Sequence, residues 1–147
     1  MKLDITAPII PFEGLGGIKL YSTREELKDI LSLDGVESKI MRSGWIEYRI
    51  QNSVALTFHL TNNKLFRIVA LDNYQGKLFG KIGIGTTEEE MLAIEPSFVF
   101  EDFEEVWESE KGVIAETLCA TSSIWRIIVY IPEMMSDDFY DVEKCNW

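Results

Sequence analysis

Apolar and polar residues alternate over residues 45–71 in the way that is typical of half-buried strands. In the run VALTFHL (54–60) the apolar positions on one side are Val54, Leu56, Phe58 and Leu60. TNNK (61–64) predicts a tight turn, because asparagine tolerates positive φ, and LFRIVAL (65–71) then returns antiparallel. With WIEYRI (45–50) in front, we expect three consecutive strands.

Two helix starts precede such strands. The capping pattern S/T-x-x-E occurs at Ser22 or Thr23 with Glu25 or Glu26, and again at Thr86 or Thr87 with Glu89 or Glu90. The first helix is expected at about 23–33, because Leu27, Ile30 and Leu31 have helical spacing. The second is expected at about 87–95, and Pro96 ends it.

The chain contains an internal repeat. Residues 15–31 align with 79–95 at an offset of 64 and share six of 17 positions. Residues 54–71 align with 113–130 at an offset of 59, and Val54/Val113, Arg67/Arg126 and Ile68/Ile127 are identical. The strand expected at 45–50 then corresponds to EEVWES (104–109), which places Tyr48 at the position of Trp107.

These patterns predict an α+β fold with two β-α-β-β-β repeats, a mainly antiparallel sheet and both helices packed on one face. We expect a single domain over residues 1–147, with repeats at about 15–71 and 79–130. DNYQGK (72–77) is the expected linker, and residues 131–147 form an acidic tail without a counterpart in the first repeat.

Composition narrows the class of protein. Apolar residues make up 46% of 147 residues, which excludes a disordered chain. No apolar run approaches the ~18 residues of a membrane span, and Asp4, Pro8 and Pro11 interrupt a signal-peptide pattern. We therefore expect a soluble, cytoplasmic protein with no membrane partner, whose Cys119 and Cys145 are reduced.

The charge is unevenly distributed. The net charge is −11, but residues 1–87 carry 9 acids and 11 bases, whereas residues 88–147 carry 16 acids and 3 bases. The densest stretch contains Glu88, Glu89, Glu90, Glu95, Glu101, Asp102, Glu104, Glu105, Glu108 and Glu110, and a second cluster contains Asp137, Asp138, Asp141 and Glu143. Such a surface repels phosphate backbones, so nucleic acid is not expected as a partner.

Two interpretations of the acidic stretch remain open. Acidic faces keep small proteins in solution, and they also attract strongly basic partners and set the register of docking. Aromatic and apolar residues interleave with the acids, which is a feature of interface cores and also of a strand with one buried face. The interleaved residues are Phe98, Phe100, Phe103, Val106 and Trp107.

The sequence contains few residues with catalytic or ligand-binding patterns. The single histidine, His59, lies mid-strand with no nucleophile elbow in the sequence, and we expect it to be partly exposed or a hydrogen-bonded structural residue. GLGG (14–17) and GKIGIG (80–85) have neither Walker nor dinucleotide spacing. The acids lack the spacing of a calcium loop. We therefore expect no catalysis, no cofactor and no metal.

The repeated unit resembles a known family. IGIGTTEEEM (82–91), echoed by IKLYSTREEL (18–27), is similar to the tandem repeat of the β-lactamase inhibitory protein-like group, a unit that also occurs singly in a small outer-membrane assembly lipoprotein. Without a lipobox cysteine or a stapling disulfide, a secreted role does not carry over. In size, acidity and lack of catalytic groups the chain resembles immunity proteins of bacterial polymorphic toxin systems, including contact-dependent growth inhibition.

This second resemblance implies a function. An immunity protein binds and neutralises its cognate toxin, and many such toxins are nucleases with basic clefts. We expect residues 98–110 to bind such a partner, with Trp107 or a neighbouring aromatic as the anchor. The expected partner-binding residues are Glu101, Asp102, Glu104, Glu105, Trp107, Glu108 and Glu110.

Other modes and functions remain open at this stage. The partner could instead add a strand to an open sheet edge. Alternatively, the chain is a small-ligand module that uses the concave face of its sheet, a regulatory subunit of a constitutive complex, or an uncharacterised hydrolase. The sequence does not indicate the oligomeric state.

Overall fold

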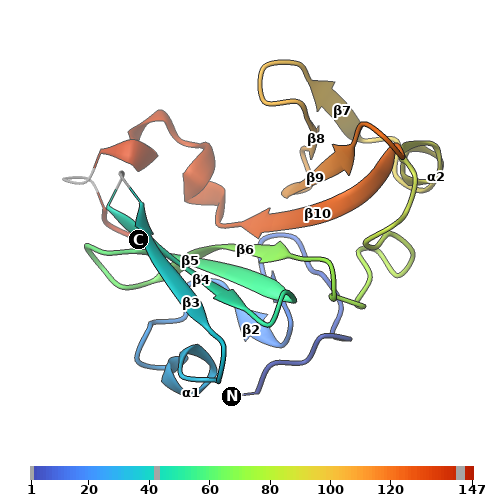
Figure 1. Ribbon diagram of the computed structural model, residues 1–147. Helices are drawn as coiled ribbons and strands as arrows, with labels where there is room; N and C mark the ends of the chain where they lie inside the picture. The colour runs from blue at the N-terminus through green and yellow to red at the C-terminus, as the bar shows by residue number, and fades with distance from the viewer. Residues whose placement is uncertain (1, 42–43, 142–144) are drawn as a thin grey trace.

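The protein is built mainly from β-strands (Figure 1). The computed structural model describes residues 2–41, 44–141 and 145–147, so Glu143 of the tail cluster lies outside the described residues. The elements are β1 (Gly14–Leu15), β2 (Ile18–Lys19), α1 (Lys28–Leu31), β3 (Glu37–Met41), β4 (Trp45–Ile50), β5 (Val54–His59), β6 (Leu65–Ala70), α2 (Glu88–Ile94), β7 (Phe98–Glu101), β8 (Val106–Ser109), β9 (Val113–Leu118), β10 (Ser123–Tyr130), and the 3₁₀ turns η1 (Pro132–Met135) and η2 (Asp137–Tyr140).

Eight strands form one antiparallel sheet. Their order is β3-β4-β5-β6-β10-β9-β8-β7, so two four-stranded meanders meet where β6 pairs with β10. Ala70 pairs with Ile127, and Ile68 pairs with Val129. At the repeat offset of 59, Ile68 corresponds to Ile127 and Ala70 to Val129, so the pairing is symmetric between the two halves. The two halves of the sheet are therefore related by an approximate twofold axis between β6 and β10.

The chain before each helix pairs with the hairpin of its own half in the same way. Ahead of α1, the Tyr21 N–H donates to the Leu65 carbonyl, and the Arg24 N–H donates to the Asn63 carbonyl. Ahead of α2, the Gly85 N–H donates to the Ile124 carbonyl, and the Glu88 N–H donates to the Ser122 carbonyl. These bonds repeat at an offset of 64 on one side and 59 on the other, the same two offsets as in the sequence.

The predicted fold class is wrong. Only four residues of the expected helix 23–33 are α-helical, and α2 has seven residues, so this is not an α+β fold with helices packed on a sheet face. Helices this short gain little from their own hydrogen bonds. Each helix contributes a buried side chain to the core, Ile30 from α1 and Met91 from α2.

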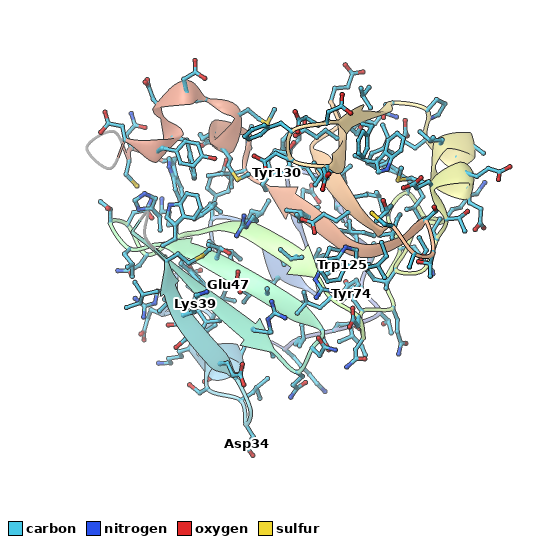
Figure 2. The ribbon with its side chains drawn as sticks, turned by 45° about the horizontal axis from the view of Figure 1, so that its top comes forward. Asp34, Lys39, Glu47, Tyr74, Trp125 and Tyr130 are labelled. Carbon is cyan, nitrogen blue, oxygen red and sulfur yellow. The ribbon has the colours of Figure 1, made fainter. Side chains whose placement is uncertain are left out.

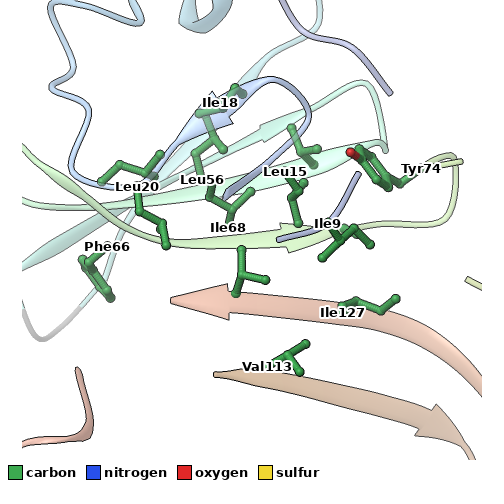
Figure 3. Close-up of a cluster of buried hydrophobic side chains, with 14 of the residues drawn as sticks. Ile9, Leu15, Ile18, Leu20, Leu56, Phe66, Ile68, Tyr74, Val113 and Ile127 are labelled. Carbon is green, nitrogen blue, oxygen red and sulfur yellow. The ribbon is translucent and has the colours of Figure 1, made fainter. Parts of the chain in front are cut away.

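The main core lies between one face of the sheet, here called the core face, and the chain from residue 3 to residue 20. Leu15 and Ile18 of the β1–β2 hairpin pack over Leu56 and Ile68 (Figure 3). The Tyr74 hydroxyl fastens this layer, because it accepts from the Gly16 N–H at 2.7 Å and donates to the Ala7 carbonyl at 2.5 Å. The N-terminal segment is therefore part of the fold.

The opposite face, here called the second face, is partly covered by the C-terminal segment. Val69, Ile128 and Tyr130 form a smaller buried cluster there, against which Met134 packs. Beyond it, Phe139 is buried beside Phe66 and stacks on Trp147. The segment expected as an acidic tail thus packs against the first half of the molecule.

Among the described residues, no helix is long and apolar enough to cross a membrane.

Candidate functional site

The β7–β8 hairpin carries the predicted partner-binding residues at one end of the sheet (Figure 1). Residues 98–110 contain six acids and no base. The strands pair antiparallel with Val99 opposite Glu108 and Phe100 opposite Trp107. Residues 102–105 form the turn, and Glu105 adopts a φ of +57° there.

The structure brings the predicted acids together on this hairpin. Glu101 ends β7 and accepts the Glu104 N–H, which closes the turn. The side chains of five acids are exposed, and none forms an ion pair within the described part of the chain: Asp102, Glu104, Glu105, Glu108 and Glu110. These five carboxylates are therefore free to meet an external cation.

The sequence around the hairpin contains few bases. Lys111 is the one lysine or arginine between Lys81 and Arg126, and its ammonium group binds Glu95 at 2.7 Å. That contact holds the pKa of Glu95 below its ordinary value. The acids of the hairpin therefore produce a local negative potential that attracts cationic groups.

Trp107, the named anchor, is half-buried. Its ring lies edge-on to Phe100 with centroids 5.2 Å apart, and its indole N–H points to the Glu88 carboxylate at 3.4 Å. The corresponding pair in the first half is Tyr48 with Arg24, whose guanidinium donates to the Tyr48 hydroxyl at 2.8 Å. Trp107 thus supports the hairpin from the core face and has little free surface.

The most exposed apolar side chains of the hairpin are on β7 and in the turn. Phe103 at the turn is 88% exposed, Val99 is 68% exposed and Phe100 is 42% exposed. Phe100 and Phe103 were among the interleaved aromatic residues, whereas Val99 was missed. The exposure of Val99 follows once residues 98–101 are assigned to a strand, because period-two alternation puts Val99 on the opposite face from buried Phe98.

The second face of the first half carries a different polar group. A cross-strand row runs through Lys39, Glu47, Thr57 and Arg67, and Figure 2 labels its first two members. The Arg67 Nη2 atom lies 3.9 Å from Glu47 and 3.5 Å from the Thr57 hydroxyl. Burial lowers the pKa of Arg67, while the charges of Glu47 and Glu116 oppose that shift. These contacts involve the Nη2 atom, whereas the Nε atom of Arg67 is buried without a hydrogen-bond partner among the described residues.

A surface pocket of about 440 Å³ lies elsewhere, between the N-terminal segment and the β1–β2 hairpin. Ile10, Phe12 and Leu20 line it, with Glu13 and Lys19 at polar positions. It is not on the concave sheet face that the small-ligand alternative requires. Within residues 2–41, 44–141 and 145–147, no group of three or more His, Cys, Asp and Glu residues is placed to hold a metal.

His59 and the two cysteines do not form a site. His59 is 1% exposed, and its Nδ1 atom accepts the Thr61 N–H at 3.2 Å. It is therefore a buried, hydrogen-bonded structural residue and not a partly exposed one. Cys119 is exposed, Cys145 is half-buried, and both are free thiols.

Comparisons with known proteins provide a fold likeness. No protein-family model and no curated protein matches this chain. Among solved structures, the chain is similar to a cysteine-rich secretory protein from Staphylococcus aureus subsp. aureus Mu50, with a TM-score of 0.51 and 10% sequence identity. The match covers 91% of this chain and 51% of that protein, so this chain spans about half its length. At this identity the likeness concerns the fold alone.

Proposed function

We propose that this protein is a cytoplasmic immunity protein that binds and neutralises a basic toxin domain of the nuclease type. It acts by binding, without a catalytic step of its own. The observation that carries the proposal is the β7–β8 hairpin, on which Val99, Phe100 and Phe103 are exposed among six acids and no base. Exposed apolar anchors inside a charged surround are the usual composition of a binding hot spot.

The charge of the hairpin fits the chemistry of the proposed partner. A nuclease cleft is lined by Lys and Arg that bind phosphates, so a row of carboxylates competes for the same groups. The carboxylates raise the association rate and select basic partners, while the apolar side chains supply affinity.

The first test is capture of the partner and measurement of its effect. The tagged protein is used to retain proteins from the source cell at low salt, and bound proteins are released at about 0.5 M salt, where surface charges are screened. The proposal requires that a released basic protein arrests growth when expressed alone and that co-expression of this chain restores growth. Retained proteins that are harmless alone contradict it.

Charge reversal with a matched control locates the binding surface. The variant Asp102→Lys/Glu104→Lys/Glu108→Lys changes three exposed acids of the hairpin, and Asp29→Lys/Asp34→Lys/Glu37→Lys makes the same change in net charge on the first half. We expect the hairpin variant to weaken partner binding at least about tenfold, most strongly at low salt, and the control to leave it nearly unchanged. Equal losses in both would show that only the net charge matters.

A further inference from the structure

β7 is an open edge of the sheet. It is the last strand in the order and pairs only with β8 among the described strands. Alternate residues of an edge strand direct their N–H and C=O groups away from the sheet. On β7 the Phe98 N–H donates to the Glu95 carbonyl at 3.5 Å. By the same alternation, the next outward N–H and C=O groups are those of Phe100.

The opposite edge provides a comparison within the same molecule. β3 carries Glu37 and Lys39, charges that natural sheets use to discourage strand addition. β7 has no charged residue before Glu101 at its end, although Val99 is as exposed as Ile40 on β3, at 68% and 70%. Of the two edges, β7 is the one that lacks this protection.

We infer that the partner binds by adding an extended, basic strand to the free edge of β7. This inference rests on the proposed function and specifies its binding mode. The register of the hairpin determines what such a strand must present. Val99 and Glu101 share the second face with Glu108, while Phe100 shares the core face with Trp107. The added strand therefore places Lys or Arg on every second residue, toward Glu101 and Glu108, and apolar residues toward Phe100.

Charge identifies the occupant of this edge. A second copy of the chain would bring six acids of one hairpin against six acids of the other, and like charges across paired strands are destabilising. A neutral strand would satisfy the main-chain groups but leave the carboxylates without partners. A basic strand satisfies both, since its cations lie within reach of the carboxylates as its main chain pairs with β7.

A peptide probe tests the main-chain pairing directly. The probe is a peptide of about seven residues that alternates Lys and Val, a typical strand length, compared with variants N-methylated at one position each. We expect methylation to weaken binding about tenfold at the alternate positions that pair with the four residues of β7 and to have little effect elsewhere. The reason is that only alternate N–H groups of an added strand face its partner. Binding that ignores the position of the methyl group, or no binding at about 1 mM, overturns the edge mode.

A pair of protein variants tests the edge in the intact chain. Val99→Lys introduces a lysine on β7, comparable to Lys39 on β3. Ile40→Lys makes the same substitution on β3, at a position that is equally exposed. We expect Val99→Lys to reduce peptide and partner affinity at least about tenfold and Ile40→Lys to leave both unchanged. As a control, circular dichroism and the unfolding midpoint are measured to check that both variants are folded.

The outcomes separate this inference from the proposed function. If the hairpin charge reversal weakens the toxic partner while Val99→Lys does not, the protein docks by surface charge and the edge mode is wrong. If no captured protein is toxic, the proposed function is wrong, and the inference that rests on it is withdrawn with it.

Discussion

His59 shows how a residue's surroundings change its chemistry. Its ring lies among Phe66, Phe139 and Trp147, with centroid distances of 5.9–6.4 Å, and burial holds its pKa below the ordinary value of 6.5. The strand alternation predicted a polar face for this position. The C-terminal segment covers that face, and its contact with a strand 80 residues earlier has no local signal in the sequence.

We expect His59 to make stability depend on pH just below neutrality. As the pH falls below 6.5, the unfolded chain gains a proton at this histidine while the folded protein resists it, so the free energy of unfolding decreases until the folded-state pKa is reached. His59→Asn retains an acceptor for the Thr61 N–H and removes this dependence. Urea unfolding at pH 7.5 and 5.5 measures the difference.

Three hydrogen-bonded carboxylates affect stability at a more acidic pH than His59. The pKa values of Glu26, Asp72 and Glu90 are lowered by hydrogen bonds, so these groups lose their stabilising charge only at more acidic pH. A variant and parent that lose the same stability between pH 7.5 and 5.5 would contradict the role given to His59.

At the scale of elements, α2 agrees with the prediction in both its cap and its length, whereas α1 agrees in neither. Thr87 and Glu90 form a reciprocal capping box, and Thr23 and Glu26 make the same pair of bonds. α2 ends just before Pro96, as predicted. The bonds between Thr23 and Glu26 do not start α1, however, because that helix begins at Lys28 and its N-cap, Leu27, makes no side-chain capping bond. The length of α1 depends on how many of the following residues find room against the sheet, which is a tertiary property.

Removing the cap should destabilise the protein measurably. Thr87→Ala deletes the hydroxyl that accepts the Glu90 N–H at 3.2 Å, and we expect a loss of about 1 kcal/mol in the free energy of unfolding. Glu89→Ala, at an exposed position of the same helix, serves as the control, with an expected change below about 0.5 kcal/mol. Chemical denaturation of both variants gives the comparison, and equal losses would contradict a specific capping role.

The sequence analysis did not predict the two edge strands as separate elements, although it noted that the pattern from Phe98 to Trp107 also suits a strand with one buried face. ESKIM (37–41) and FVFE (98–101) are short, and neither contains the long alternation that identified 54–60. An edge strand is exposed on one side along its whole length, so its hydrophobic pattern is weak. This omission matters for function, because β7 is the edge to which we assign partner binding.

At the scale of the whole molecule, the C-terminal segment joins the two halves. It continues from β10 of the second half and inserts Phe139 against Trp45 and Phe66 of the first. The Asn62 side chain donates to the Trp147 carbonyl at 3.0 Å, which adds a polar tie to the same contact. The approximate twofold symmetry of the sheet is broken at this point, since the first half has no such extension.

Phe139 should therefore be as important to stability as a residue of the sheet. Phe139→Ala removes a buried ring, and we expect a loss of about 3–5 kcal/mol in the free energy of unfolding. Phe103→Ala deletes the same atoms at a position that is 88% exposed, with an expected change below about 0.5 kcal/mol. Thermal and urea unfolding compare the two variants, and a small effect of Phe139→Ala would show that the segment packs only loosely.

The sequence by itself determined the local features of this protein. Alternation located the strands at 45–50, 54–59 and 65–70, the TNNK turn follows from the positive φ of Asn63, and the two offsets of the repeat reappear in the hydrogen bonds ahead of each helix. The strands and the turn depend on residues that are close in the sequence, and the matching hydrogen bonds follow from the sequence similarity of the two repeats.

Only the tertiary structure decided which of these features are buried and which are accessible. Long-range packing shortened α1, covered His59, turned Trp107 toward the core face and left Val99 and Phe103 exposed among the acids. The physical reason is that burial depends on what lies across the sheet or beyond its edge. Those contacts join residues far apart in the chain, so no local pattern records them.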